Sequence, residues 1–249
     1  MGVFGAAFAL GRARPAATPR EAAIDAPTVQ KRDTPAWGAT DPETARLGAD
    51  VGRVDAASVA TNDANVDVDA RTALREALAS DDVAVRIAGI ERVASKTSIA
   101  ALPELTRFRL EKDPAAAPTV IHAIALLGAS AEGRDRDEAS KTLTQWLGQE
   151  SKREGVDAVG NVSNIVEALG DVGGRDAALA LASALDGGAL PLHVQILAVQ
   201  KLGELAEPRT RPSVERFAAR AEALPKAEDL EEELRVEAIK SARETLARL

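Results

Sequence analysis

The sequence predicts an all-α protein in which antiparallel helix pairs stack into an α-solenoid, and three observations support this fold class. The chain is 45% hydrophobic but only 2% aromatic, with no Tyr. Much of its apolar content is Ala, Leu and Val, and Ala and Leu are strong helix formers. From residue 69 onward, no segment alternates apolar and polar residues as a half-buried strand does. One helical segment also recurs at the spacing of stacked repeats.

Residues 1–10 form a short apolar run followed by Arg12 and Arg14. A secretory signal carries its positive charge before the apolar region, so this order disfavours a cleaved signal. We interpret the run as an ordinary disordered or helical terminus, with the truncated end of a membrane anchor as the alternative. No apolar run reaches the roughly 18 residues of a membrane-spanning helix. The compartment stays open between the cytoplasm and the cell envelope.

Residues 11–68 are predicted to form a disordered, Pro/Ala/Asp-rich linker. Prolines recur through Pro42, and the sparse apolar residues show no period. Trp37 is unusual in such a segment. We interpret it as part of the mobile chain, with docking on the folded domain or on a partner as the alternative.

The end of this linker raises the question of a calcium site. Asp63, Asn65, Asp67 and Asp69 alternate as at the start of an EF-hand loop. The sixth position of such a loop needs Gly and the twelfth needs Glu, whereas this chain has Val and Leu there. The acids are better explained as the lead into the first helix, where the helix dipole favours negative charge.

The recurring segment is first seen in residues 82–94, DVAVRIAGIERVA. Like four later segments, it ends in a large apolar residue followed by Gly or Ala. These small residues lie 34, 42, 33 and 44 positions apart, and a period of roughly 20–50 residues is typical of a stacked array. Small side chains there would let neighbouring helices cross closely. They are Ala94, Gly128, Gly170, Gly203 and Ala247.

A second helix is predicted between successive segments, with apolar residues at helical spacing. With a helix around Leu74 first, the count is five helix pairs over residues 69–249. No pair can bury its apolar face alone, so neighbours must stack into one continuous core. The other second helices are marked by Leu102, Leu105 and Phe108, by Leu143, Trp146 and Leu147, by Leu179, Ala182 and Leu185, and by Val214, Phe217 and Ala221.

These features resemble the HEAT-repeat family, particularly its short bacterial PBS-lyase-type repeats. An Asp-x-x-Val-Arg-x-Ala opening, an ALPEL segment and the Leu-Gly endings match the family pattern. The match departs at Ala117, which stands where the second copy should have Arg, and the later copies lack the opening. The matching residues are Asp82, Val85, Arg86, Ala88, residues 101–105 and the Leu-Gly pairs at 127–128, 169–170 and 202–203.

The resemblance implies a right-handed superhelix of about five antiparallel pairs, in which one helix of each pair lines a concave face. Those helices are expected at residues 82–95, 114–129, 159–171, 190–206 and 231–248. The longer spacings imply insertions, which we expect at residues 129–140, 148–160 and 224–234.

A polar column on the expected concave helices is the candidate binding surface. Three positions before the small residues, four of the five helices carry a carboxyl or amide side chain, and Ala125 interrupts the series. Two further polar residues would flank this column. An outward helix position is usually polar in any case, so the competing interpretation is a solvated surface. The candidate partner-binding residues are Glu91, His122, Asn164, Glu167, Gln200 and Glu244.

The remaining motifs do not indicate catalysis. His122 and His193 have no metal-ligand spacing, and Gly173-Gly174 is predicted to be a turn and not a phosphate loop. The run AEDLEEELR at 227–235 is typical of a solvated helix start, with a recruitment patch for a basic partner as the alternative. No Cys is present, and we expect no catalytic residue, metal or cofactor.

The chain has a formal net charge of −8 and a pI near 5.0, which disfavours nucleic acid and favours a basic protein partner. We therefore expect a non-enzymatic scaffold that presents its concave surface to a protein. One alternative is a HEAT-like enzyme of the bilin lyase or DNA glycosylase type. Another is an architectural subunit tethered to a membrane by its N-terminus. Because the last helix keeps Leu246 and Leu249, association through the solenoid ends is a further expectation.

Overall fold

The computed structural model describes residues 68–226 and 230–249. Within these residues every regular element is a helix, which confirms the all-α prediction. The predictions for residues 1–10, for the linker, for Trp37 and for all of the calcium candidate except Asp69 lie outside the described part of the chain.

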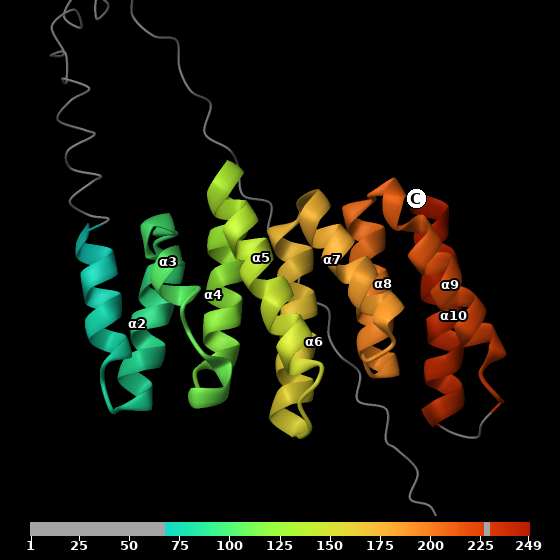
Figure 1. Cartoon of the computed structure of the whole chain (residues 1–249), viewed down its shortest axis with the longest axis horizontal. Helices are drawn as coiled ribbons and strands as arrows, with labels where there is room; N and C mark the ends of the chain where they lie inside the picture. Colours follow the sequence, from blue (N-terminus) through green and yellow to red (C-terminus); the bar gives the residue numbers. More distant parts are fainter. Residues whose placement is uncertain (1–67, 227–229) are drawn as a thin grey trace, which may run out of the picture. The chain divides into compact units, whose positions relative to one another are not determined.

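The helices follow one another with short connections (Figure 1). A helix over residues 68–78 comes first, and three short 3-10 turns lie at Ile99–Ala101, Leu110–Lys112 and Pro208–Thr210. The other helices are α2 (Val83–Ser95), α3 (Leu102–Leu105), α4 (Ala117–Ser130), α5 (Gly133–Glu150), α6 (Val156–Val172), α7 (Gly174–Gly187), α8 (Leu192–Leu205), α9 (Arg211–Ala223) and α10 (Leu230–Arg248).

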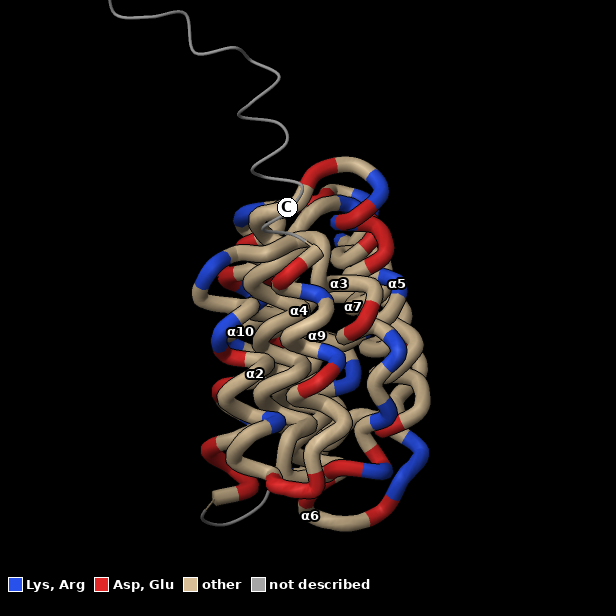
Figure 2. Tube along the Cα trace, turned by 90° about the vertical axis from the view of Figure 1, so that its left-hand side faces the viewer, with Lys and Arg blue, Asp and Glu red and all other residues tan. Residues whose placement is uncertain are grey.

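The helices pack in two layers. In the first layer α2 contacts α4, α4 contacts α6, α6 contacts α8, and α8 contacts α10. In the second layer α5 contacts α7 and α7 contacts α9. Viewed end-on, α2 and α10 lie on one side and α5 on the other (Figure 2). The first-layer helices begin and end within a few residues of the positions expected from the sequence.

Local sequence explains where several helices begin and end. The Asp82 carboxylate accepts a hydrogen bond from the Ala84 amide at 2.8 Å and so caps α2. Gly173 and Gly174, with φ of +71° and +80°, end α6 and begin α7. Glycine adopts this left-handed backbone without steric cost. The prediction of a turn at Gly173-Gly174 is therefore confirmed.

Two features of the second layer differ from what the sequence suggested. Residues 129–140 and 148–160, expected as insertions around the Trp146 helix, lie for the most part within α5 and the start of α6. The solvent-facing side of α5 is rich in charge, which disguised its buried stripe through Ala139, Leu143 and Trp146. The helix around Leu102 stops at Leu105, so Phe108 lies outside it and is half-buried.

The glycines of the recurring segment mark close crossings between successive first-layer helices. A Cβ atom added to Gly128 would lie 2.9 Å from a methyl group of Val172 on α6. One added to Gly170 would collide with the Lys201 side chain on α8, and one added to Gly203 would lie 2.8 Å from the Thr245 hydroxyl on α10. The separations at Gly128 and Gly203 are shorter than van der Waals contact, so a side chain at either position would have to displace its neighbour, whereas the flexible Lys201 side chain could move away from Gly170.

We expect Gly203→Val to lower the free energy of unfolding by about 1–3 kcal/mol, because overpacking must displace Thr245 and α10. The loss from overpacking should exceed the roughly 0.3–0.5 kcal/mol of helix propensity that replacing glycine by valine gains. Urea unfolding followed by circular dichroism measures this change.

Gly160→Val is the matched control, because Gly160 lies within α6 and an added Cβ meets nothing within 4 Å. It should change stability by no more than about 0.5 kcal/mol. Equal losses of stability in the two variants would show that the close approach of Thr245 to Gly203 does not cause the destabilisation.

An ion pair joins α2 to the segment before α4. Arg86 Nε donates to the Asp113 carboxylate at 2.6 Å, and Arg86 Nη1 donates to the Ser80 carbonyl at 2.8 Å. Both charged side chains are only 16% exposed. The hydrogen bond from Arg86 lowers the pKa of Asp113 below its ordinary value, although burial of the carboxyl opposes the shift.

The lowered pKa of Asp113 predicts a pH-dependent contribution to stability. A carboxyl whose folded-state pKa is depressed stabilises the fold fully above its unfolded pKa of about 3.9, and this stabilisation is lost as the pH falls through the folded value. Asp113→Asn should therefore cost roughly 1–2 kcal/mol at neutral pH, and its difference from wild type should shrink in acid. Unfolding curves from pH 7 downward test this.

Glu138→Gln provides the comparison for Asp113→Asn. Glu138 is exposed on α5 and has no ion-pair or hydrogen-bond partner in the described chain. Its substitution should leave stability close to wild type throughout the pH range. A difference for Asp113→Asn that is constant with pH would contradict the assignment of its effect to the ion pair.

Candidate functional site

The six residues of the predicted polar column all lie on first-layer helices. Asn164 is half-buried and the other five are exposed. The structure brings His122, Asn164 and Glu167 together around a shallow cavity of about 110 Å³ between α4 and α6, with Asp171 at its edge. Three of the six predicted residues therefore line one common depression in the surface.

The remaining three residues are placed differently. Gln200 donates its side-chain amide to the Ser241 hydroxyl at 3.2 Å, so it helps to join α8 to α10. Glu91 on α2 and Glu244 on α10 are at opposite ends of the row of helices (Figure 1). Neither makes an ion pair or hydrogen bond within residues 68–226 and 230–249. The column is thus a polar row along the layer and not one cluster.

The centre of this layer is acidic. Together, α4, α6 and α8 contain four carboxylates (Asp157, Glu167, Asp171 and Glu204) and one lysine, Lys201. The Lys201 ammonium lies 3.3 Å from Asp171 and 3.0 Å from Glu204, so its charge is already engaged. A ligand that meets the exposed side of these helices encounters excess negative charge.

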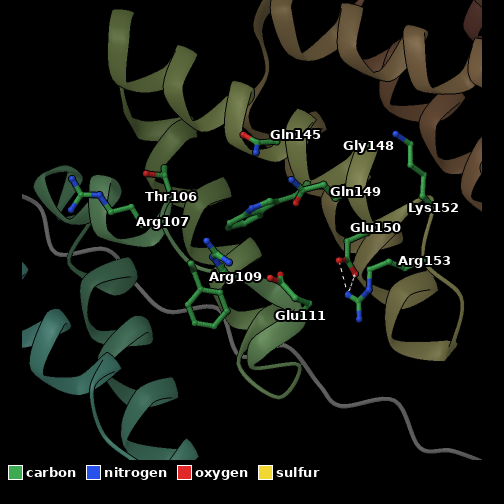
Figure 3. Close-up of a pocket in the computed structure, with 12 residues that line it drawn as sticks. Thr106, Arg107, Arg109, Glu111, Gln145, Gly148, Gln149, Glu150, Lys152 and Arg153 are labelled. Carbon is green, nitrogen blue, oxygen red and sulfur yellow. Dashed lines mark hydrogen bonds and ion pairs between the residues drawn. The ribbon is translucent and has the colours of Figure 1, made fainter.

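A cavity that the sequence did not predict lies on the second layer. Its volume is about 720 Å³. Residues 106–111 form one wall, and residues 145–153, from the end of α5 and the following turn, form the other (Figure 3). We refer to this cavity as the α5 cleft.

A buried carboxylate organises one end of the α5 cleft. The Glu150 side chain is only 3% exposed. It accepts hydrogen bonds from Arg153 Nη1 at 2.7 and 2.9 Å and from the Asn161 amide at 3.0 Å. The bond to Glu150 raises the pKa of the Arg153 guanidinium. These contacts offset the burial of a negative charge at the C-terminus of α5, where the helix dipole disfavours it.

The sequence contained only a weak signal for the α5 cleft. The segments RFRLEK at 107–112 and SKREG at 151–155 are both basic, but they lie about 40 residues apart and the second was interpreted as an insertion. Trp146 was correctly placed on a buried helix face, and it is 6% exposed. Only the packing of the 106–111 segment beside α5 brings these features together.

The described chain shows no group of three or more His, Asp or Glu side chains placed to hold a metal ion. None of its helices combines the length and apolar character needed to cross a membrane. Asp69, the one described member of the calcium candidate, lies in the first helix.

Glu150→Gln tests whether this buried cluster is structural. The neutral amide would lose the charge-assisted bonds to Arg153 and Asn161, and we expect the free energy of unfolding to fall by roughly 1–3 kcal/mol. Glu154→Gln is the control, because Glu154 is exposed on the same turn and unpaired in the described structure. Denaturant unfolding of both variants gives the comparison. Equal stabilities would show that the cluster contributes nothing to the fold.

Comparison with known proteins identifies no relative. No protein-family model matches the chain, and no curated protein or solved structure matches it. The resemblance to HEAT repeats therefore rests on the residues quoted above.

Proposed function

We propose that this protein is a non-enzymatic scaffold that presents the surface of α2, α4, α6, α8 and α10 to a basic protein partner. The proposed architecture is a right-handed α-solenoid of about five HEAT-like pairs, with this surface on its concave side. The sequential packing of the first layer and the glycine crossings support a stacked array. The proposal also includes the association of two copies of the chain through the helices at the ends of the row.

The excess of negative charge on the first layer is the observation that carries the proposal. Glu167 and Asp171 lie beside the depression between α4 and α6, and the only lysine of the three central helices is already paired. A rigid helical surface has little conformational entropy to lose on binding. Complementary charge would speed association and select a basic partner.

The alternatives remain separate hypotheses. A bilin lyase would bind a tetrapyrrole, which absorption spectroscopy would detect, and a DNA glycosylase would release a base from duplex DNA. A membrane-tethered subunit would depend on residues 1–10. No contact within residues 68–226 and 230–249 favours any of the three over the scaffold.

The test compares three forms of the full chain as affinity baits in native lysate. One is wild type, and one carries Glu91→Lys, Glu167→Lys and Glu244→Lys. The control carries Glu138→Lys, Glu154→Lys and Asp176→Lys, which make the same charge change at exposed positions outside the first layer. We expect quantitative mass spectrometry to find a basic protein bound by wild type and control but reduced about tenfold or more on the first-layer variant.

Other outcomes would contradict the proposal. Equal recovery on all three baits would move the binding surface away from the first layer. Equal loss on both variants would reflect net charge alone and not a defined surface. If no protein is enriched on the wild type, the scaffold interpretation fails. Circular dichroism of all three baits establishes that the helices are intact.

A further inference from the structure

A groove between the first helix (residues 68–78) and α2 combines apolar walls with a polar end. The two helices stand at one end of the row (Figure 1). The groove has a volume of about 540 Å³, and its lining residues lie between positions 69 and 77 and between positions 85 and 98. We refer to it as the α2 groove. We propose that it binds a single-chain amphiphile with one negative head group, such as a medium-chain fatty acid.

The register of α2 places apolar and basic lining residues on one side of the helix. Positions 85, 89, 92 and 96 are three or four residues apart, so they follow one another along the same side. A Cβ atom added to Gly89 would collide with Ala77, so this side of α2 faces the first helix. Glu91, the α2 member of the predicted polar column, does not line the groove. The inference is therefore independent of the proposed scaffold function.

The walls of the α2 groove are mostly apolar. Seven of the twelve lining residues are Ala, Val or Leu. Among them Ala73, Val85 and Ala88 are exposed, and an alkyl chain that displaces water from them would gain free energy. A helix rises by 1.5 Å per residue, so α2 spans roughly 16 Å between Val85 and Lys96. The groove is therefore long enough for an extended chain of medium length.

Two cations lie at the end of α2. Arg92 is in its last turn and Lys96 is its C-cap residue. Neither side chain has an ion-pair or hydrogen-bond partner in the part of the chain that the structure describes. Asp69 is the one carboxylate among the lining residues, and it forms no ion pair with either cation. The lining thus has an excess of one positive charge, which suits one negative head group.

Ser98 adds a hydrogen-bond donor at the same end of the groove. It lines the groove and is only 7% exposed. Its hydroxyl has no hydrogen-bond partner among the described residues, and it is not one of the buried polar atoms sealed from solvent. Buried hydroxyls are normally hydrogen-bonded. An unpartnered one close in sequence to Arg92 and Lys96 therefore favours a ligand whose head group has oxygen acceptors, such as a carboxylate.

The combination of these features favours an amphiphile over simpler ligands. A volume of about 540 Å³ lies within the range of roughly 300–1,000 Å³ of small-molecule sites, which are mostly apolar with a few polar groups. An inorganic anion would leave the apolar walls in water. An uncharged hydrocarbon would leave the cations and the Ser98 hydroxyl without a partner.

Dodecanoate, kept below its micelle concentration, is the probe for the full-length protein. We expect isothermal titration calorimetry to show saturable binding with a Kd of about 0.1 mM or below. Butyrate keeps the head group without the long tail, and dodecyltrimethylammonium keeps the tail with the opposite charge. Neither should displace dodecanoate at equal concentration. Nuclear magnetic resonance of carboxyl-labelled dodecanoate detects binding that releases no heat.

A first pair of variants tests the apolar walls. Val85→Asp places a negative charge among them and should weaken binding about tenfold or more. Val156→Asp makes the same change at a valine of α6 that is 88% exposed and outside the groove, and it should bind as wild type does. Because Val85 is itself exposed, both variants should fold, which circular dichroism verifies.

A second pair of variants tests the head-group end. Arg92→Gln with Lys96→Gln should weaken binding about tenfold or more. Arg134→Gln with Arg175→Gln removes the same charge from exposed, unpaired positions on α5 and α7, and it should leave the affinity unchanged.

Three results would overturn the proposal. The first is no saturable binding by either method up to about 5 mM dodecanoate. The second is equal affinity within either pair of variants, which would place the bound dodecanoate outside the groove. The third is a self-association of the ligand-free chain, measured by sedimentation, that Val85→Asp abolishes and dodecanoate leaves unchanged. That result would make the groove an interface between copies of the chain.

Discussion

The close crossing of successive first-layer helices is the constraint on which the rest of the structure depends. At Gly128 and Gly203 an added Cβ atom would lie 2.7–2.9 Å from side chains of the neighbouring helices, and at Gly170 it would meet the flexible Lys201 side chain. Each first-layer helix contacts the next one along this layer, from α2 through α4, α6 and α8 to α10. The glycines set the helix separation, and the large apolar residue before each of them is then fully buried.

The interfaces share this geometry but differ in their polar contacts. Arg86 of α2 binds Asp113 before α4, Lys201 of α8 binds Asp171 of α6, and Arg216 of α9 binds Asp186 of α7. These partners come from different positions and from both layers. Hydrogen bonds from arginine lower the pKa of Asp113 and of Asp186 alike. Similar ion pairs between helices are thus built from residues at different positions in different interfaces.

The sequence predicted the features that depend on apolar spacing or on local backbone geometry, and it did not predict those that depend on contacts between distant segments. First-layer helices were located within a few residues because their apolar spacing survives where the motif is lost. The turn at Gly173-Gly174 could be predicted from the sequence because it depends on local backbone geometry. The length of α5 was missed because charged residues occupy its solvent side.

The binding features were only partly predictable, because they depend on distant segments. Helix spacing predicted that His122, Asn164 and Glu167 share a face, and these residues line one depression. It could not show that Gln200 is engaged by Ser241, 41 positions further along the chain. The α5 cleft joins segments 106–111 and 145–153, and neither segment alone contains a recognisable motif.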